Sequence, residues 1–199
     1  MQSARDYFEL AQQLIHPLAP MLVAIGGLSG TGKSVLARAI APDVMPQPGA
    51  VVLRSDVLRK QLFKVNETDR LPESAYRPEI TEQIYEILAQ RASGILAQGH
   101  SVVVDAVFAR EAERAAIRDA ARRLNIRFVG LFLDADLATR LSRVGHRQRD
   151  ASDATPEIAE RQEKYDFGPV DWAAIDASGT PGQTLKQCQT EIARGEAAR

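Results

Sequence analysis

The sequence predicts an α/β fold in which a parallel sheet of about five strands lies between two layers of helices. Five short apolar runs recur along the 199 residues, and each is too short to form a buried helix. Stretches with apolar residues at helical spacing separate these runs. Strands that alternate with helices require crossover connections, which make the strands parallel and place helices on both faces of the sheet.

The chain starts with a predicted amphipathic helix at residues 4–15, where aromatic and aliphatic residues recur every three or four positions. Pro17 and Pro20 end this helix. Residues 21–25, Met-Leu-Val-Ala-Ile, predict the first strand. A continuous apolar run of this length is typical of a strand that is buried on both faces of a parallel sheet.

Four further strands and seven further helices continue the alternation. No internal repeat or low-complexity stretch interrupts them, so we interpret 1–199 as one domain. Within it, 1–19 forms an N-terminal helix and linker, and 20–195 forms the core. The strands are expected at 51–53, 101–105, 128–134 and 173–177, and the helices at 34–40, 55–63, 79–97, 110–124, 136–148, 156–164 and 181–194.

The composition is that of an ordinary globular domain, with 45% hydrophobic and 26% charged residues. The formal net charge of −1 gives no indication of a nucleic-acid or membrane surface. No apolar run approaches the roughly 20 residues that a membrane helix needs. Cys188 is the only cysteine, which excludes a disulfide framework and favours a reduced, cytoplasmic compartment.

A glycine-rich segment directly follows the first predicted strand. Residues 27–34 satisfy the P-loop pattern G-x-x-x-x-G-K-[ST] between a strand and a helix, which is the context that the pattern requires. The glycines let backbone N–H groups point at phosphate oxygens, and the helix that follows directs its positive dipole end to the same place. Lys33 reaches the β- and γ-phosphates, and the Ser34 hydroxyl is a ligand for Mg²⁺. The predicted ATP contacts are Gly27, Leu28, Ser29, Gly30, Thr31, Gly32, Lys33, Ser34 and Val35.

The rest of the chain favours a small kinase among the P-loop proteins. A GTPase needs an Asn-Lys-x-Asp signature, and neither Asn66 nor Asn125 is followed by lysine. The large ring and transporter ATPases have longer chains and additional motifs. We therefore expect the P-loop three-layer sandwich with strand order 2-3-1-4-5 and an extra N-terminal helix.

Asp56 follows the second predicted strand, at the sheet edge where ligands bind in open α/β sheets. It is our candidate for the catalytic base that accepts a proton from the acceptor hydroxyl. Arg59, one helical turn later on the same face, is the candidate for binding the acceptor. The alternative is that Ser55 or Asp56 only caps the helix and that Arg59 faces solvent.

Two strands end in aspartate after an apolar run, at Asp105 and Asp134. Both strands flank the P-loop strand, so either carboxylate suits the Mg²⁺ side of the site. We favour Asp105, beside Ser34 and the substrate. Asp134 and Asp136 suit the start of the next helix, where acidic residues interact favourably with the helix dipole.

That next helix carries several arginines and runs into an acidic segment rich in small residues. This pattern is typical of a lid that closes over the phosphates, here at about 140–155. We expect an arginine of the lid to stabilise charge on the transferred phosphoryl group, with Arg143 and Arg147 ranked ahead of Arg149. The alternative is that these cations complement a helix C-terminus and otherwise face water.

The segments G-G-L-S-G-T-G-K-S, R-S-D-V-L-R-K and V-V-V-D-A-V-F resemble the P-loop kinase superfamily that includes polynucleotide 5′-hydroxyl kinases, chloramphenicol phosphotransferase, gluconokinase and zeta toxins. The resemblance spans nearly the whole chain. Its nearest subgroup is a set of predicted kinases that are often fused to an aminoglycoside-phosphotransferase-like domain. The helix at residues 4–15 resembles the linker helix of those fusions.

The resemblance implies Mg-ATP as the phosphoryl donor, Asp56 as the base and Arg59 as an acceptor contact. Polynucleotide kinases usually follow the aspartate that matches Asp105 with a Thr-Asn pair, whereas this chain has Ala106-Val107-Phe108. That departure favours a small hydroxyl-bearing acceptor over nucleic acid. Two other functions stay open, namely an ATP-binding switch without an acceptor and a zeta-toxin-like nucleotide-sugar kinase.

Overall fold

The structure, a computed structural model, describes residues 2–146 and 150–194. Its elements lie at or within a few residues of the predicted positions. The strands are β1 (Met21–Gly27), β2 (Val51–Arg54), β3 (Val102–Asp105), β4 (Arg127–Asp134) and β5 (Ala173–Asp176). The α-helices are α1 (Gln2–Ile15), α2 (Lys33–Ile40), α3 (Ser55–Leu62), α4 (Pro78–Ala97), α5 (Glu111–Arg122), α6 (Leu137–Gly145), α7 (Pro156–Gln162) and α8 (Pro181–Arg194), and two short 3-10 helices span Ala41–Asp43 and Glu73–Tyr76.

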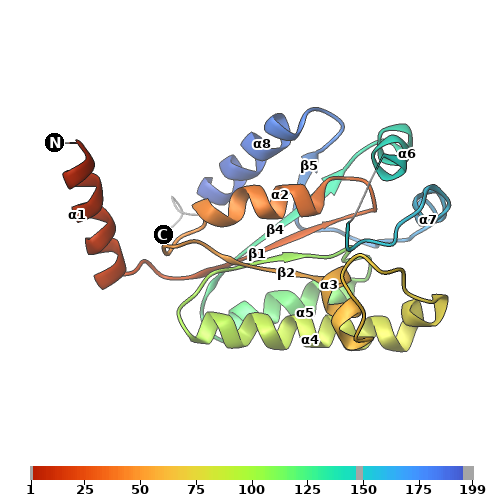
Figure 1. Ribbon diagram of the computed structural model, residues 1–199, viewed down its shortest axis with the longest axis horizontal. Coiled ribbons are helices and arrows are strands. Elements are labelled where there is room, and N and C mark those ends of the chain that lie inside the picture. Colours follow the sequence, from red (N-terminus) through yellow and green to blue (C-terminus); the bar gives the residue numbers. More distant parts are fainter. Residues whose placement is uncertain (1, 147–149, 195–199) are drawn as a thin grey trace.

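The five strands form one parallel sheet in the order β2-β3-β1-β4-β5, so the predicted order is confirmed. Helices α2 and α8 pack together on one face of the sheet, and α4 and α5 pack together on the other (Figure 1). This is the three-layer sandwich that alternating strands and helices require.

The central strand β1 is covered by helices on both faces, which explains why its sequence is apolar without interruption. Leu22 and Ala24 belong to the core cluster on the α4 and α5 face, whereas Val23 and Ile25 belong to the cluster on the α2 and α8 face. All four residues are fully buried. Because successive side chains of a strand point to opposite faces, a strand with helices on both sides needs apolar residues at every position.

Parallel pairing brings the carboxyl ends of the strands to one edge of the sheet. Asp105 of β3 lies opposite Ile25 of β1 on one side and opposite Arg54 of β2 on the other. Helices α6 and α7 lie beyond this edge (Figure 1). The fold therefore gathers the P-loop, the ends of β2 and β3, and the predicted lid region at one end of the molecule.

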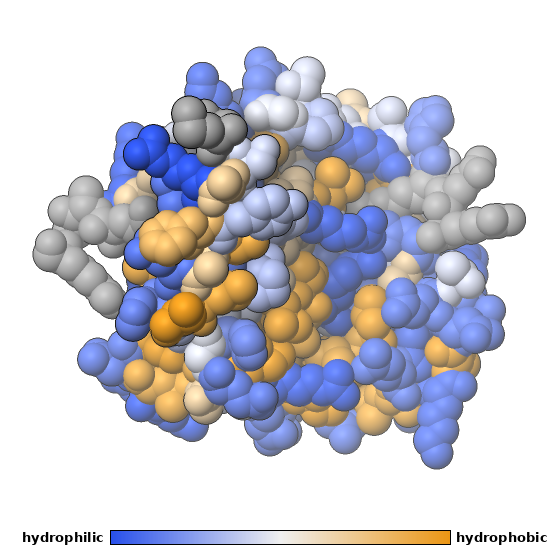
Figure 2. All heavy atoms as spheres, turned by 60° about the vertical axis from the view of Figure 1, so that its left-hand side comes forward, coloured by the Kyte–Doolittle hydropathy of each residue, from blue (hydrophilic) through white to orange (hydrophobic). Residues whose placement is uncertain are grey.

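Helix α1 stands apart from the sheet and its helices (Figure 1). Its aromatic residues Tyr7 and Phe8 are 74% and 64% exposed, and Leu14 and Ile15 are exposed as well. Figure 2, in which α1 lies toward the viewer, shows apolar side chains beside charged ones on this helix. Among the residues that the structure describes, no helix is long and apolar enough to cross a membrane.

Candidate active site at the carboxyl edge of the sheet

The P-loop connects the end of β1 to the start of α2 with three glycines at positive φ. The φ angles are +129° at Gly27, +88° at Gly30 and +96° at Gly32. A Cβ atom at Gly30 would lie 2.6 Å from the backbone oxygen of Arg140, so only glycine fits there. A Cβ atom at Gly32 would meet nothing within 4 Å, because this glycine borders open space at the N-terminus of α2. That open space is where a helix N-terminus binds phosphate.

Two side chains of the P-loop donate hydrogen bonds to a backbone carbonyl group of the same loop. The carbonyl oxygen of Leu28 accepts hydrogen bonds from the Thr31 hydroxyl and from Lys33 Nζ, both at 2.9 Å. The backbone N–H of Ser29 donates to Gln162 of α7 at 2.8 Å. The ammonium group of Lys33 therefore lies at the loop, in the position from which a P-loop lysine reaches bound phosphates.

Helix α6 packs directly on the P-loop through Arg140. The Arg140 side chain is 1% exposed, and its guanidinium interacts with Ser29 O and with the Glu163 carboxylate. Asp136 caps α6 by accepting hydrogen bonds from the N–H and hydroxyl of Thr139 at 2.8 and 2.7 Å. Asp136 thus has the helix-starting role that its position predicted, and Asp134 is exposed.

The donor set for a metal ion lies between the P-loop and β3. Ser34 Oγ donates a hydrogen bond of 2.6 Å to Asp105 Oδ2. A hydroxyl and a carboxylate are the oxygen ligands that Mg²⁺ prefers, and Mg²⁺ usually takes its remaining ligands from phosphates and water. No group of three acidic, histidine or cysteine side chains suited to a metal exists within residues 2–146 and 150–194. Ser34 and Asp105 provide two oxygen groups of the kind that can hold Mg²⁺ beside a nucleotide.

Arg54, the last residue of β2, joins this pair from the other side. Its Nε lies 3.1 Å from Asp105 Oδ2, and its Nη2 lies 3.0 Å from Ser34 Oγ. The same Nη2 donates to Asp150 Oδ1 at 2.8 Å. Burial alone would lower the pKa of Arg54, but the hydrogen bond to Asp150 and the charges of Asp105 and Asp150 raise it above its ordinary value. The guanidinium is therefore held firmly in its charged form.

Asp56 lies in the first turn of α3, in the same cluster of charges. Burial raises the pKa of its carboxyl above the ordinary value, and the negative charge of Asp105 raises it further. The cations Lys33 and Arg54 and a hydrogen bond with Ser152 act in the opposite direction. A carboxylate that has lost part of its hydration and holds its proton more tightly than usual suits proton transfer better than an ordinary surface aspartate.

The segment 150–153, which we call the strap, crosses from the lid region to α3. Its Asp153 accepts hydrogen bonds from Lys60 Nζ and Tyr76 Oη, both at 2.6 Å, and from the N–H of Leu71 at 3.0 Å. Although burial alone would raise the pKa of Asp153, the hydrogen bonds from Lys60 and Tyr76 lower it below its ordinary value. The buried ion pair between Asp153 and Lys60 thus holds the strap against α3, the helix that carries Asp56.

Arg59 does not face solvent, which was the alternative to its binding an acceptor. Its side chain is buried, and Nη1 donates to Ala75 O at 2.6 Å. Its guanidinium also lies 4.9 Å from the centre of the Tyr76 ring and 3.4 Å from Thr81 Oγ1. Residues 73–81 cover the helix face that carries Arg59, so the structure uses this arginine to hold that segment. A direct contact between Arg59 and an acceptor stays a prediction.

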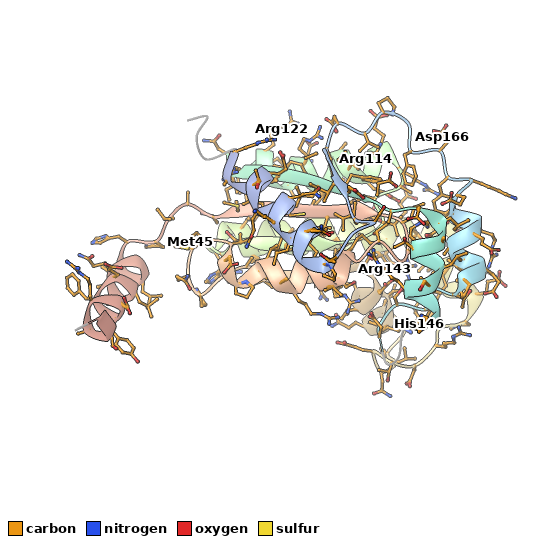
Figure 3. The ribbon with its side chains drawn as sticks, turned by 90° about the horizontal axis from the view of Figure 1, so that it is seen from above. Met45, Arg114, Arg122, Arg143, His146 and Asp166 are labelled. Carbon is orange, nitrogen blue, oxygen red and sulfur yellow. The ribbon has the colours of Figure 1, made fainter. Side chains whose placement is uncertain are left out.

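The two predicted lid arginines differ in what the structure describes. Arg143 of α6 (labelled in Figure 3) donates to Ala177 O at 2.7 Å and to Gly179 O at 2.9 Å, on the turn after β5. Arg147 and Arg149 lie outside the described residues, and their roles stay predictions. Arg140, which was not among the predicted residues, is the arginine of α6 that lies against the loop.

Several residues of this cluster had no role in the sequence argument. Arg54 could have been found by the reasoning that selected Asp56, because it too ends a parallel strand at the ligand-binding edge. Gln162 and Asp153 carry no local signal, since their hydrogen-bond partners are more than 75 residues away in the chain. Only the packing of the strap and α7 against the sheet edge brings them together.

The fold and this cluster define a P-loop protein of the kinase-like type. A family model described as "AAA domain" matches residues 22–168. Because this match covers more than half of the 199 residues, the chain belongs to that family. The resemblance to P-loop kinases seen in the sequence is thereby confirmed.

Proteins of similar sequence include an uncharacterized protein of Mycobacterium tuberculosis (strain ATCC 25618 / H37Rv) and one of Mycobacterium bovis (strain ATCC BAA-935 / AF2122/97). Each is 30% identical, in an alignment that covers 89% of this chain and 36% of the relative. The chain thus spans about a third of the length of the curated relatives it matches.

Solved structures with the same fold include a gluconokinase from Sinorhizobium meliloti 1021, with a TM-score of 0.60, 20% identity, and coverage of 88% of this chain and 93% of that one. The Mycobacterium tuberculosis APS kinase CysC in complex with AMPPNP and APS gives a TM-score of 0.61 at 22% identity, covering 90% of this chain and 99% of that one. At these identities the likeness concerns the fold.

Proposed function

We propose that this chain is an ATP-dependent kinase that transfers the γ-phosphoryl group of Mg-ATP to a hydroxyl of a small-molecule acceptor. The observation that carries the proposal is the position of Asp56, whose carboxylate interacts with Lys33 of the P-loop and with Asp105 on the metal side. A nucleotide-dependent switch needs no base at that place. A phosphotransferase does, because the acceptor hydroxyl must lose its proton.

In the proposed reaction Asp56 takes the proton of the acceptor hydroxyl while that oxygen attacks the γ-phosphorus. The bond from phosphorus to the bridging oxygen breaks, and ADP leaves with the electron pair. Lys33 stabilises the negative charge on the phosphates, and the backbone N–H groups of the P-loop hold them in line. Ser34 and Asp105 would hold Mg²⁺, which would neutralise negative charge on the phosphates.

An arginine from the lid completes this proposal. Arg147 keeps the role that the sequence indicated. Arg143 serves it only if its hydrogen bonds to Ala177 O and Gly179 O are released when nucleotide binds. A guanidinium near the transferred group stabilises the charge that spreads over its oxygens in the transition state.

A small acceptor is supported by the residues after β3. Phe108 is fully buried, its backbone N–H donates a hydrogen bond to Tyr85 Oη at 2.9 Å, and its ring packs on Tyr85 and Trp172. An aromatic cluster therefore fills the place that follows Asp105. The fold neighbours named gluconokinase and APS kinase also support a small acceptor.

The proposal is tested by measuring ADP release from Mg-ATP with a panel of acceptors: nucleosides, 5′-hydroxyl oligonucleotides, sugars, sugar acids, nucleotide sugars and aminoglycosides. Stimulation by one class, lost in Asp56→Asn while ATP affinity changes less than about threefold, supports the kinase and identifies its acceptor class. Stimulation that persists in Asp56→Asn contradicts the role of the base. ATP binding without stimulation by any acceptor favours the switch, and stimulation confined to nucleotide sugars favours a toxin-like kinase.

Helix α1 is our candidate for the contact with a further domain, such as an aminoglycoside-phosphotransferase-like partner. Its exposed apolar side chains and the greater length of the curated relatives support this role. Deleting residues 2–19 is expected to leave ATP affinity unchanged, because α1 stands apart from the site. We place the reaction in the cytoplasm, where ATP and reducing conditions coincide.

A further inference from the structure

Arg54 occupies the one position between the two groups that are suited to hold a metal ion. Its guanidinium contacts Ser34 Oγ at 3.0 Å and Asp105 Oδ2 at 3.1 Å. These are the hydroxyl and carboxylate oxygens to which Mg²⁺ would bind. The side chain of Arg54 is 10% exposed and that of Asp105 is 6% exposed, so water screens their interaction little.

The charges around Arg54 explain why a cation is needed there. Asp56, Asp105 and Asp150 all act electrostatically on this guanidinium. Three carboxylates near one another, partly removed from water, repel each other strongly unless a cation compensates them. Lys33 supplies one positive charge from the P-loop side, and Arg54 supplies the other.

We propose that Arg54 is a positioning residue that competes with Mg²⁺ for Ser34 and Asp105, so that Arg54 leaves these two groups when Mg²⁺ binds there with a nucleotide. The inference rests on the proposed function, because it requires that the site binds Mg-nucleotide. Two cations cannot share the same carboxylate and hydroxyl oxygens at close range without strong repulsion. Mg²⁺ binding therefore has to include the release of Arg54.

A cavity beside Arg54 can accept its side chain after release. A cavity of about 380 Å³ lies along β2 and the adjoining side of α3, and Arg54 itself lines it. Glu67 also lines this cavity and provides a carboxylate toward which the released guanidinium can turn. Release of Arg54 also breaks its ion pair with Asp150, the first residue of the strap. Metal binding and the position of the strap are coupled through this one side chain.

The first test compares AMPPNP affinity with Mg²⁺ and with EDTA by isothermal titration calorimetry. The ratio of the two affinities measures how much Mg²⁺ strengthens nucleotide binding. In Arg54→Gln the competing cation is gone, so the ratio is expected to rise about tenfold over that of the unchanged protein. Arg38→Gln is the matched control, because Arg38 lines the same cavity and lies outside the Ser34–Asp105 pair. The control should leave the ratio unchanged.

The second test observes Arg54 directly by NMR of ¹⁵N-arginine-labelled protein. The Nε–H of Arg54 donates to Asp105 and is expected to give a signal that exchanges slowly with water. Arg54→Lys assigns this signal by removing it. Mg-AMPPNP should abolish the slow exchange, whereas AMPPNP in EDTA should preserve it. This test needs no loss-of-function variant and so does not depend on how well Arg54→Gln folds.

The outcomes separate the inference from the function on which it rests. A protein that binds no AMPPNP in either buffer contradicts both. Normal Mg-AMPPNP binding, an unchanged affinity ratio in Arg54→Gln and a retained Nε–H signal would overturn the inference alone. In that case Arg54 would be a fixed structural partner of Asp105 throughout the catalytic cycle.

Discussion

Asp56, Asp105 and Arg54 show how single residues acquire their chemistry from their surroundings. Asp56 is an ordinary aspartate by sequence, yet burial and the charge of Asp105 shift its protonation. Asp105 would repel Asp56 more strongly without Arg54 and the Ser34 hydroxyl beside it. The protonation of these carboxyl groups therefore depends on the balance among closely placed charges.

The raised pKa of Asp56 predicts the acid limb of the pH–rate profile. A base acts only in its deprotonated form, and the folded protein raises the pKa of Asp56 above the ordinary 3.8, so turnover should fall as the pH drops through that raised value. The measurement is kcat/KM for the acceptor across the acid range at saturating Mg-ATP, with circular dichroism as the control for folding. A rate that stays constant down to pH 4 in folded protein would contradict the assignment of Asp56 as the base.

The buried ion pair between Lys60 and Asp153 predicts a large loss of stability on mutation. The Lys60 side chain is 1% exposed and Asp153 is 11% exposed, so Asp153→Asn leaves a buried lysine without its counter-charge. We expect the free energy of unfolding to fall by about 3 kcal/mol in urea titrations. Asp171→Asn, in the exposed pair with Arg118, is the control and should cost less than about 1 kcal/mol. Equal losses would show that burial does not decide the effect.

Among the elements, α6 and the P-loop are joined most tightly. The backbone of α6 at Arg140 approaches Gly30 so closely that no side chain fits between them. The lid region therefore starts from a helix that is packed on the phosphate-binding loop itself.

We expect opposite effects from alanine substitutions at Gly30, which contacts α6, and at Gly94, which lies inside α4 without such a contact. Gly30→Ala places a Cβ 2.6 Å from Arg140 O at a φ of +88°, so we expect at least a tenfold loss of AMPPNP affinity and about 2 kcal/mol of stability. Gly94→Ala, inside α4 with nothing within 4 Å, should instead stabilise the protein by about 0.5–1 kcal/mol. Urea titration and calorimetry measure both. Unimpaired nucleotide binding by Gly30→Ala would contradict the tight packing of α6 on the loop.

The molecule as a whole combines a rigid sheet with a site assembled from distant segments. The buried strands β1 and β3 hold the P-loop and Asp105, whereas the strap and α7 reach the site from the second half of the chain. A ligand that contacts all of these parts binds the folded state and not the unfolded chain. Binding should therefore be visible as global stabilisation.

The expected stabilisation follows from linkage. Mg-AMPPNP at 100 times its dissociation constant should add about 2.7 kcal/mol to the free energy of unfolding. For a protein of this size the melting temperature should rise by about 5–10 °C, which differential scanning calorimetry measures. Lys33→Ala should lose most of this shift, and Asp56→Asn should keep it. A shift of the same size in Lys33→Ala would show that the ligand binds outside the P-loop.

Local spacing was sufficient to predict the strands, the helices, their succession along the chain and the P-loop, whereas the strand order in the sheet was taken from P-loop proteins of the kinase type. Apolar runs of strand length, helical periodicity and a glycine pattern depend only on neighbours in the chain. The parallel topology then places the ends of β2 and β3 at the ligand edge, which is why Asp56 and Asp105 could be named in advance. The structure brings Asp105 beside Ser34, as that reasoning expected.

The partners across space could not be predicted in this way. The i to i+3 spacing puts Asp56 and Arg59 near one face of a helix, but residues 73–81 cover the part that carries Arg59. Arg143 lies on the predicted helix and carries the expected positive charge, but its guanidinium donates hydrogen bonds to carbonyl groups after β5. The cation beside Asp105 is Arg54, whose second partner, Asp150, is 96 residues away. Spacing along the chain decides which side chains share a face, whereas only tertiary packing decides what that face meets, because long-range contacts depend on how the elements pack together.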